Sequence, residues 1–362
     1  MAKTKPHHHR AIRLNLALQG GGAHGAYSWG VLDRLLEEDD IELIGISGTS
    51  AGAMNAVVVA DGLNKGGRKQ AQKQLAEFWQ KVSGYQGVFA PPALEVDDSV
   101  FKQFSQGWNL AFGWMETLSR NFSPYELNPL NINPLRDVLA EMIDFDRLHA
   151  EGSLHLFITA TNVETGQPQV FRCEDVTLDA LMASACIPFL FQAVEIDGAS
   201  YWDGGYMGNP SIWPLVYHTE CDDILLVQIN PLERKGTPTR SLEIIDRLNE
   251  ISFNSSLVAE MRAIHFVKKL IAGGKLDDEE YKDIRMHMIA ADKGMKDFTA
   301  ATKLAVSWDF FRHLHDIGYR LAGEWIKKHK ADIGHKETLD IEKFFLRKAP
   351  AKYRPPTSTR SS

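Results

Sequence analysis

Short apolar runs and segments with helical spacing alternate along most of the chain. Runs of apolar residues bounded by turn residues predict strands, and apolar residues three to four positions apart predict helices between them. The predicted strands cover residues 12–18, 41–47, 154–161, 170–172, 224–229 and 285–290. The predicted helices cover residues 26–38, 51–60, 68–83, 135–143, 243–272 and 299–329.

The segment 41–47 is apolar on both faces apart from Glu42. Strands buried on both faces are typical of parallel sheets covered by helices. The alternation of strands and helices therefore predicts an α/β layer fold. No internal repeat interrupts it.

Residues 84–134 break this rhythm, because they are rich in Gly, Pro, Asn and aromatic residues. Within them, five apolar residues fall at helical spacing: Phe101, Phe104, Trp108, Phe112 and Met115. Such a stripe either packs on the core or forms a lid or a surface that meets lipid. We favour packing on the core, which is the commoner role of a stripe like this.

Composition narrows the class of protein. The chain has 362 residues, of which 44% are hydrophobic and 24% charged, enough for one large domain or two average ones. The net charge of −7 argues against a dedicated nucleic-acid binder. The three cysteines form no CxxC pair, which excludes a disulfide scaffold and a cysteine zinc site and fits a reducing compartment.

The sequence contains no apolar stretch near eighteen residues, which excludes a transmembrane helix. The N-terminus is basic but no long apolar segment follows, so we expect no secretory signal and a cytoplasmic location. The basic segment 331–362 is expected to be a loosely ordered tail. A peripheral membrane contact through it stays open.

Residues 20–25, GGGAHG, form a glycine loop between a predicted strand and a predicted helix. One interpretation is a dinucleotide fingerprint built on Gly20, Gly22 and Gly25. The other is a cradle of backbone N–H groups for an oxyanion. A dinucleotide site needs an acid near the carboxyl end of the second strand, but Glu42 lies at the opposite end. This favours the oxyanion cradle.

A GxSxG sequence follows the second strand directly and opens the next helix. This strand–turn–helix context is the one in which the motif forms a nucleophile elbow. Gly48 and Gly52 permit a sharp turn that exposes the hydroxyl of Ser50. The N–H of Ala51, at the start of the helix, is placed to help hold an oxyanion.

Ser50 needs a base, because a serine hydroxyl is a poor nucleophile at neutral pH. None of the thirteen histidines lies in a motif typical of a triad loop. The better candidate is Asp203, followed by Gly204 and Gly205 in what we expect to be a tight, exposed turn. A carboxylate partly removed from water has a raised pKa and can accept the serine proton. A plain turn is the alternative.

Three runs in this order resemble a patatin-like phospholipase: LALQGGGAHGAYSWGVLDRLLE, GISGTSAGAMNA, and MASACIPFLFQ with YWDGGYMGNP. The resemblance covers about residues 14–215, and the part up to about 330 resembles the C-terminal extension of a bacterial subgroup. It implies a three-layer α/β/α core of the FabD/lysophospholipase-like type, with a mostly parallel sheet. The implied divisions are a patatin-like domain over 14–217, an extension over 218–330 and the tail.

The resemblance also implies lipid acyl-ester hydrolysis by a Ser–Asp dyad without histidine, calcium, another metal or any cofactor. Carried over, Ser50 is the nucleophile, Asp203 is the base, and Gly20, Gly21 and Gly22 line the oxyanion hole. The expected substrate is a lipid ester, as for a phospholipase A or lysophospholipase. The alternatives are an acyltransferase with the same dyad, a dinucleotide-dependent oxidoreductase, and a non-catalytic lipid-binding protein.

One position departs from the family pattern. His24 stands where the glycine loop of the family usually has Lys or Arg. A neutral histidine would steady an anion less than a cation does, so His24 is a candidate modulator that makes activity depend on pH. The alternatives are that His24 only caps or packs the helix start, which we favour, or that it acts as a base for Ser50.

Overall fold

The structure is a computed structural model that describes residues 11–85, 121–150, 154–277, 280–291, 295, 298 and 301–346. The apolar stripe between Phe101 and Met115 lies outside these residues, and so does the last part of the basic tail.

Among the described residues, eight strands form one sheet. The strands are β1 (Ile12–Leu18), β2 (Ile41–Thr49), β3 (His155–Asn162), β4 (Pro168–Arg172), β5 (Val194–Ile196), β6 (Ala199–Asp203), β7 (Asp223–Gln228) and β8 (Arg285–Ala290). Their order is β5-β6-β3-β2-β1-β7-β8, and β4 pairs with β3 outside this path. Strands β3, β2, β1, β7 and β8 run parallel, whereas β4, β5 and β6 are joined by antiparallel pairs. The predicted α/β fold with a mostly parallel sheet is confirmed.

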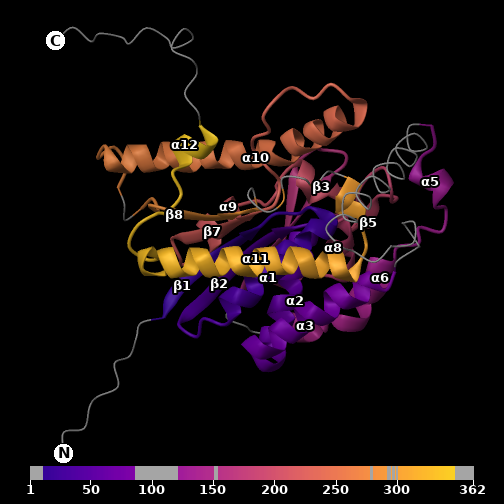
Figure 1. Cartoon of the computed structure of the whole chain (residues 1–362), viewed down its shortest axis with the longest axis horizontal. Coiled ribbons are helices and arrows are strands. Elements are labelled where there is room, and N and C mark those ends of the chain that lie inside the picture. Colours follow the sequence, from indigo (N-terminus) through magenta and orange to yellow (C-terminus); the bar gives the residue numbers. More distant parts are fainter. Residues whose placement is uncertain are drawn as a thin grey trace, which may run out of the picture.

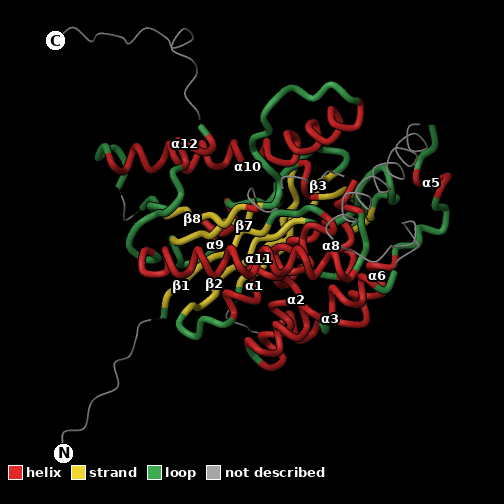
Figure 2. Tube along the Cα trace, viewed as in Figure 1, coloured by secondary structure: helices red, strands yellow, loops and turns green. Residues whose placement is uncertain are grey.

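Helices cover both faces of the sheet, as Figures 1 and 2 show. The helices on one face include α1 (Gly25–Leu36), α2 (Ala51–Gly66), α3 (Arg68–Ser83) and α11 (Trp308–His329). The helices on the other face include α9 (Trp213–His218), α10 (Ser241–Ala272) and α12 (Ile341–Phe345). The remaining helices are α5 (Pro124–Leu127), α6 (Pro134–Met142), α7 (Phe145–His149) and α8 (Leu178–Ser184).

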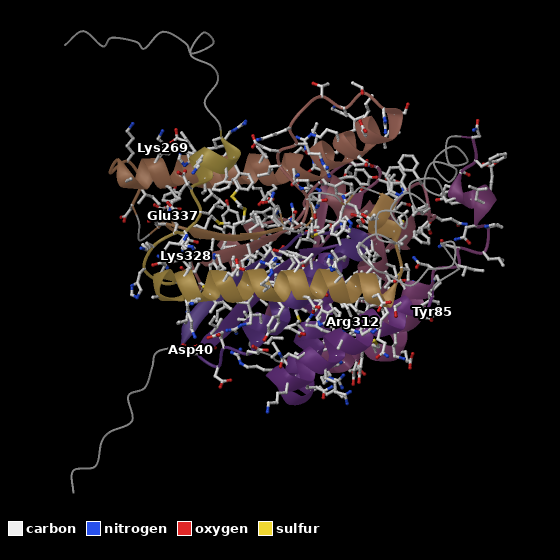
Figure 3. All side chains as sticks on the ribbon, viewed as in Figure 1. Asp40, Tyr85, Lys269, Arg312, Lys328 and Glu337 are labelled. Carbon is white, nitrogen blue, oxygen red and sulfur yellow. The ribbon has the colours of Figure 1, made fainter. Side chains whose placement is uncertain are left out.

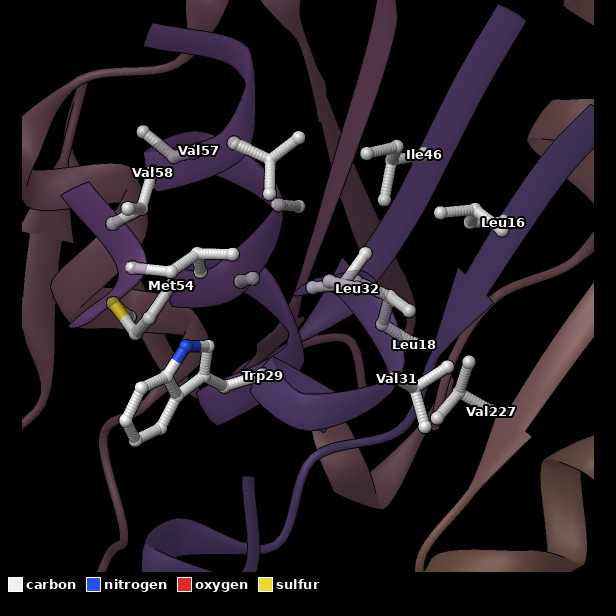
Figure 4. Close-up of a cluster of buried hydrophobic side chains, with 14 of the residues drawn as sticks. Leu16, Leu18, Trp29, Val31, Leu32, Ile46, Met54, Val57, Val58 and Val227 are labelled. Carbon is white, nitrogen blue, oxygen red and sulfur yellow. The ribbon is translucent and has the colours of Figure 1, made fainter. Parts of the chain in front are cut away.

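The alternation of side chains along each strand divides the core into two clusters. In β1, Leu16 and Leu18 belong to the cluster beneath α1, whereas Ala17 belongs to the cluster beneath α10. Successive residues of a strand point to opposite faces, so a strand buried on both sides is apolar at most of its positions. Figure 4 shows part of the first cluster, with Leu16 and Leu18 beside Val31 and Leu32 of α1.

Two glycines allow α1 and α11 to lie in backbone contact. A Cβ atom on Gly30 would come within 1.9 Å of the carbonyl oxygen of His315. A Cβ atom on Gly318 would come within 2.0 Å of the carbonyl oxygen of Tyr27. Any larger residue would force the helices apart, so this pair of glycines allows α11 to lie directly against α1.

The predicted helix over 299–329 is shorter in the structure. A 3₁₀ turn, η5 (Ala301–Leu304), comes first, and α11 begins only at Trp308. The antiparallel hairpin of β5 and β6 was not predicted, because β5 has three residues and carries little periodicity. Its turn residues Asp197 and Gly198 both have positive φ, which is the conformation that an Asp-Gly hairpin turn requires.

The first part of the expected tail is packed into the protein. Leu339, Ile341 and Phe345 are buried beneath α10, in the cluster that also contains Leu257. The expectation of loose order is therefore wrong for residues 331–346. The prediction rested on the basic composition of the segment and did not take into account the three apolar residues that anchor it.

Asp223 connects β7, β8 and this C-terminal segment. Its buried carboxylate lies 3.1 Å from Nε2 of His287 and 2.7 Å from the guanidinium of Arg285, and it accepts the N–H of Gly334 at 2.8 Å. Burial alone would raise the pKa of Asp223, but the hydrogen bonds from His287 and Arg285 outweigh it and lower the pKa to about 2. The carboxylate is therefore charged and fully paired.

We expect Asp223→Asn to reduce the free energy of unfolding by about 3 kcal/mol, because a neutral amide cannot replace the charged acceptor that binds Arg285, His287 and the N–H of Gly334. Asp222→Asn is the matched control, since Asp222 is 40% exposed and 3.5 Å from the same guanidinium. Its effect should stay within about 1 kcal/mol. Urea unfolding measures both, and equal effects would contradict this account.

Candidate active site

The strand register brings the predicted site residues to one edge of the sheet. Leu18, at the end of β1, pairs with Gly48 near the end of β2. Because β1 and β2 are parallel, the glycine loop and the GxSxG turn leave the sheet side by side. Thr159 of β3 pairs with Thr49, and the next residue of β3 pairs with Asp203 at the end of β6. Ser50 and Asp203 are thus brought to the same edge.

The turn at Ser50 has the geometry of a nucleophile elbow. Ser50 has φ 55° and ψ −124°, a conformation that L residues rarely adopt. A Cβ atom on Gly52 would lie 2.3 Å from the carbonyl oxygen of Leu18, and one on Gly48 would lie 2.6 Å from that of Gly52. Both positions therefore require glycine, because the backbone passes too close for a side chain. The two glycines allow the tight turn that holds Ser50 in its strained conformation.

Side chains from outside the elbow hold its backbone. The N–H of Ser50 donates to Oγ of Ser184 at 2.9 Å, and that hydroxyl donates to the carbonyl of Thr159 at 2.7 Å. The hydroxyl of Thr49 donates to the carbonyl of Gly208 at 2.6 Å. Sequence reasoning did not single out Ser184, although it lies within one of the family-like runs at 182–192.

The hydroxyl of Ser50 lies near enough to the carboxyl of Asp203 to lower its pKa. Asp203 is only 2% exposed, so the prediction of an exposed turn is wrong. The acid is the last residue of β6 and lies inside the protein. Burial raises the pKa of Asp203 to about 6, although the N–H of Gly205, the hydroxyl of Ser50 and the charge of Lys303 each lower it. The N–H of Gly205 lies 2.7 Å from the carboxylate.

The two positions after Asp203 have no room for a side chain. A Cβ atom on Gly204 would lie 2.0 Å from the carbonyl oxygen of Thr159, and one on Gly205 would lie 2.0 Å from the ring of Phe253. The backbone N–H of Asp203 donates to the carbonyl of Cys186 at 2.8 Å. The acid is therefore fixed by the backbone on both sides of it.

The glycine loop lies against the elbow. A Cβ atom on Gly20 would come within 2.7 Å of the carbonyl oxygen of Thr49, and Gly22 has φ +57°. The N–H of Gly20 donates to Oδ1 of Asn209 at 2.6 Å, so it is already occupied. The N–H groups left as candidate oxyanion donors are those of Gly21, Gly22 and Ala51, the last at a helix start that has no earlier carbonyl to bind.

A buried polar network supports this loop from the end of β7. Gln19 accepts the N–H groups of Ile229 and Asn230 at 2.8 Å each. Asn230 in turn donates its amide to the carbonyl of Gly20 at 2.9 Å and accepts from Nζ of Lys303 at 2.7 Å. Asn230 and Lys303 were not predicted as site residues, because single polar residues in apolar or irregular segments leave no local pattern.

His24 is buried beneath η5 and packs between aromatic rings. Its Nε2 lies 2.8 Å from the hydroxyl of Thr302, and its ring contacts Phe298 and Phe310. Burial, together with the nearby charge of Lys303, lowers the pKa of His24 well below its usual value. The ring is therefore neutral at physiological pH and occupies the loop as a packing residue.

An apolar cavity of about 190 Å³ opens beside Ser50. Its walls come from the glycine loop, α2, α3, α6, the segment after α8 and the start of α11. Figure 3 labels one wall residue, Tyr85, just beyond α3. Among the described residues that line the cavity, Lys303 is the only charged one. Such a space accepts an apolar chain.

The described residues contain no cluster of three or more His, Cys, Asp or Glu that could hold a metal ion. In the same part of the chain, every helix is too short or too polar to cross a membrane.

The family model of the patatin-like phospholipases matches residues 16–216. The chain therefore belongs to the patatin-like phospholipase family, whose membership implies lipid acyl hydrolase activity. The match includes the glycine loop, the elbow and Asp203, and it decides against the dinucleotide interpretation of residues 20–25. No curated protein sequence matches the chain.

Solved structures of two bacterial proteins are similar to the chain at low identity. VipD from Legionella pneumophila shares 16% identity with a TM-score of 0.42, over 88% of this chain and 67% of that one. ExoU in its heterodimeric complex with SpcU, from the type III secretion system of Pseudomonas aeruginosa, shares 17% identity with a TM-score of 0.34. That likeness covers 88% of this chain and 52% of ExoU. The family assignment rests on the family model.

The raised pKa of Asp203 has a consequence for stability. Above about pH 4 the unfolded chain releases this proton, whereas the folded protein retains it until about pH 6. The carboxylate therefore costs stability that grows as the pH rises from 4 to 6 and is constant above. We expect Asp203→Asn to be more stable than the wild type at pH 8, by on the order of 2 kcal/mol, and about equal to it at pH 4.

Thermal unfolding of both proteins at the two pH values measures this difference. Burial raises the pKa of Glu260 to about 7. Glu260 is present in both proteins, so its contribution cancels in the difference between their stabilities. Asp175→Asn is the control for the loss of an acid, because Asp175 is exposed and its replacement should change the free energy of unfolding little. A variant at position 203 that is less stable at pH 8 would show that the carboxylate is not under strain from burial.

Proposed function

We propose that the protein is a lipid acyl hydrolase in which Ser50 is the nucleophile and Asp203 is the base. The observation that carries this proposal is that the strained Ser50 of the elbow and the buried Asp203 leave the sheet at the same edge, with the Ser50 hydroxyl near enough to lower the pKa of that carboxyl. A carboxylate with a raised pKa is a stronger base than an exposed one, which suits it to take a proton from a hydroxyl. No histidine is needed in this arrangement.

The reaction has two acyl-transfer steps. Oγ of Ser50 attacks the ester carbonyl carbon while its proton passes to Asp203. The oxyanion that forms is held by the N–H groups of Gly21, Gly22 and Ala51. The intermediate collapses to an acyl-enzyme, and the departing alkoxide takes the proton from Asp203. Water then attacks the acyl-enzyme, gives a proton to Asp203, and releases the fatty acid as Ser50 regains its hydrogen.

The cavity supports a substrate with a long acyl chain. It begins at Ser50 and is lined almost wholly by apolar side chains, among them Met54, Phe78 and Phe191. Burying the apolar surface of an acyl chain there contributes about 25 cal/mol of binding free energy per Å². Binding should therefore strengthen with chain length. We propose phospholipids and lysophospholipids as the substrate class. An alcohol in place of water in the second step would make the same intermediate serve acyl transfer.

We expect Ser50→Ala to abolish covalent labelling by a fluorophosphonate and to reduce hydrolysis of fatty-acyl esters to background, because the nucleophile is gone. Mass spectrometry of the labelled wild type should place the adduct on Ser50. Ser184→Ala is a matched control, since it removes a neighbouring hydroxyl and should leave labelling in place at a reduced rate. Vesicle binding without any hydrolysis by the wild type would instead favour a non-catalytic lipid-binding protein.

We expect kcat/KM for a neutral ester to rise with pH and to reach half its maximum near pH 6, because the base must be ionised. Initial rates between pH 4 and 8, corrected for spontaneous hydrolysis, give this profile. Asp203→Asn should fold and lose activity across the whole range. A profile governed by a group near pH 7 in that variant would point to a histidine base.

A further inference from the structure

The peptide unit between Gly20 and Gly21 is held from outside the glycine loop. Its carbonyl oxygen, on Gly20, accepts the side-chain amide of Asn230 at 2.9 Å. Its N–H, on Gly21, is one of the proposed oxyanion donors. The carbonyl and N–H of a planar trans peptide point in opposite directions, so fixing one direction fixes the other. Asn230 therefore sets the direction of the Gly21 N–H.

The partners of Asn230 determine which way its amide faces. Nδ2 lies 2.9 Å from the Gly20 carbonyl and 3.3 Å from Oε1 of Gln19, both acceptors. Oδ1 lies 2.7 Å from Nζ of Lys303, which is only a donor. A flipped amide would place its NH₂ against the ammonium. The orientation is thus fixed, and one continuous path of donors and acceptors runs from Lys303 to the loop.

The hydrogen bond that the ammonium of Lys303 makes within the described residues lies on this path, although the carboxyls of Glu250, Asp246 and Asp203 also act on its charge. Within the described part of the chain, its ammonium contacts the amide oxygen of Asn230 and the ring face of Phe253, 5.4 Å from the ring centre. The nearby carboxylate of Glu250 is bound by Arg234 at 2.7 Å and Arg247 at 3.0 Å. The backbone of Lys303 also touches the loop, because a Cβ atom on Gly22 would lie 2.3 Å from its carbonyl oxygen.

We propose that Lys303 is a positioning residue that supplies positive charge to the oxyanion loop through Asn230. The ammonium polarises the amide of Asn230, the amide polarises the peptide between Gly20 and Gly21, and the Gly21 N–H becomes a better donor to the oxyanion. Hydrogen bonds in series strengthen one another, most of all where water is excluded. This inference rests on the proposed acyl hydrolysis and adds a residue to it.

The relay matters because negative charge appears on the substrate only during the reaction. A preorganised positive dipole then stabilises the transition state more than the bound ester, so it acts on kcat rather than on KM. The loop has no cation of its own in this position, since His24 is held neutral by burial. Lys303 reaches the loop from a segment about 280 residues further along the chain.

Lys303 also lines the cavity, so direct contact with an anionic group of the substrate is the competing role. The two roles respond differently to the substrate. A relay to the oxyanion acts on every ester, whether or not it carries a charge. Direct binding acts only on a substrate that carries a phosphate, and it changes KM. A neutral ester and a lysophospholipid therefore separate them.

The test compares Lys303→Met, which removes the charge and keeps most of the length, with the wild type on p-nitrophenyl butyrate and on lysophosphatidylcholine. We expect kcat to fall about tenfold or more on both esters, as part of the 10²–10³ lost with a whole oxyanion donor, with KM within about twofold. Fluorophosphonate labelling should slow to a similar extent. Lys303→Arg should recover much of the rate, because it restores a cation within reach of Asn230.

Two further variants check the path. Asn230→Ala should slow the reaction as Lys303→Met does, and the double variant should be little slower than either, because members of one relay are not additive. Lys282→Met is the control for a lost lysine: Lys282 donates to backbone carbonyls of Val216 and Thr219 away from Ser50, and its loss should leave kcat unchanged. Thermal unfolding confirms that each protein is folded under assay conditions.

An unchanged kcat of Lys303→Met on the neutral ester would overturn the relay, and so would a loss confined to a raised KM for the lysophospholipid. Additive effects of the changes at 303 and 230 would also overturn it. If Lys303→Met does not fold, the rates of Lys303→Arg and Asn230→Ala decide the question. Failure of the wild type to label at Ser50 would instead refute the proposed function itself.

Discussion

The geometry of the site depends on direct contact between the backbones of two glycine-containing turns. The glycine loop after β1 and the elbow after β2 touch through main-chain atoms: Gly52 against the carbonyl of Leu18, and Gly20 against that of Thr49. No side chain fits between them, because a Cβ atom at either glycine would come within 2.7 Å of an oxygen. The parallel register of β1 and β2 makes this contact possible, and the strained Ser50 persists because its neighbours leave it no relaxed alternative.

The parts of the fold that follow local rules could be predicted from the sequence. Buried parallel strands are apolar runs, and the turns that join them to helices are rich in glycine, so β1, β2 and the elbow were found with their correct order. Ser50 lies in such a turn. Asp203 was named through its two glycines, but its burial was not predicted, because the antiparallel hairpin that carries it inward begins with a strand of three residues.

The supporting side chains could not be predicted in the same way. Ser184, Asn209 and Asn230 each contribute one polar atom to the loop or the elbow from positions more than 130 residues away. Lys303 binds Asn230, which lies 73 residues before it. A hydrogen bond between distant residues leaves no periodicity, since its partners are neighbours only after the sheet has formed. The likeness to a family draws attention to Ser50 and Asp203, whereas the side chains that hold the loop and the elbow are identified only by the structure.

The contact between α1 and α11 packs the region after residue 216 against the part of the chain that the family model matches. Gly30 and Gly318 are interlocked, one in each region, and η5 just before α11 supplies a wall of the cavity. A chain cut near residue 216 would bare the apolar side of α1 and open the cavity to water. A different C-terminal region could keep α11 in this place only if it also had glycine opposite the carbonyl of Tyr27.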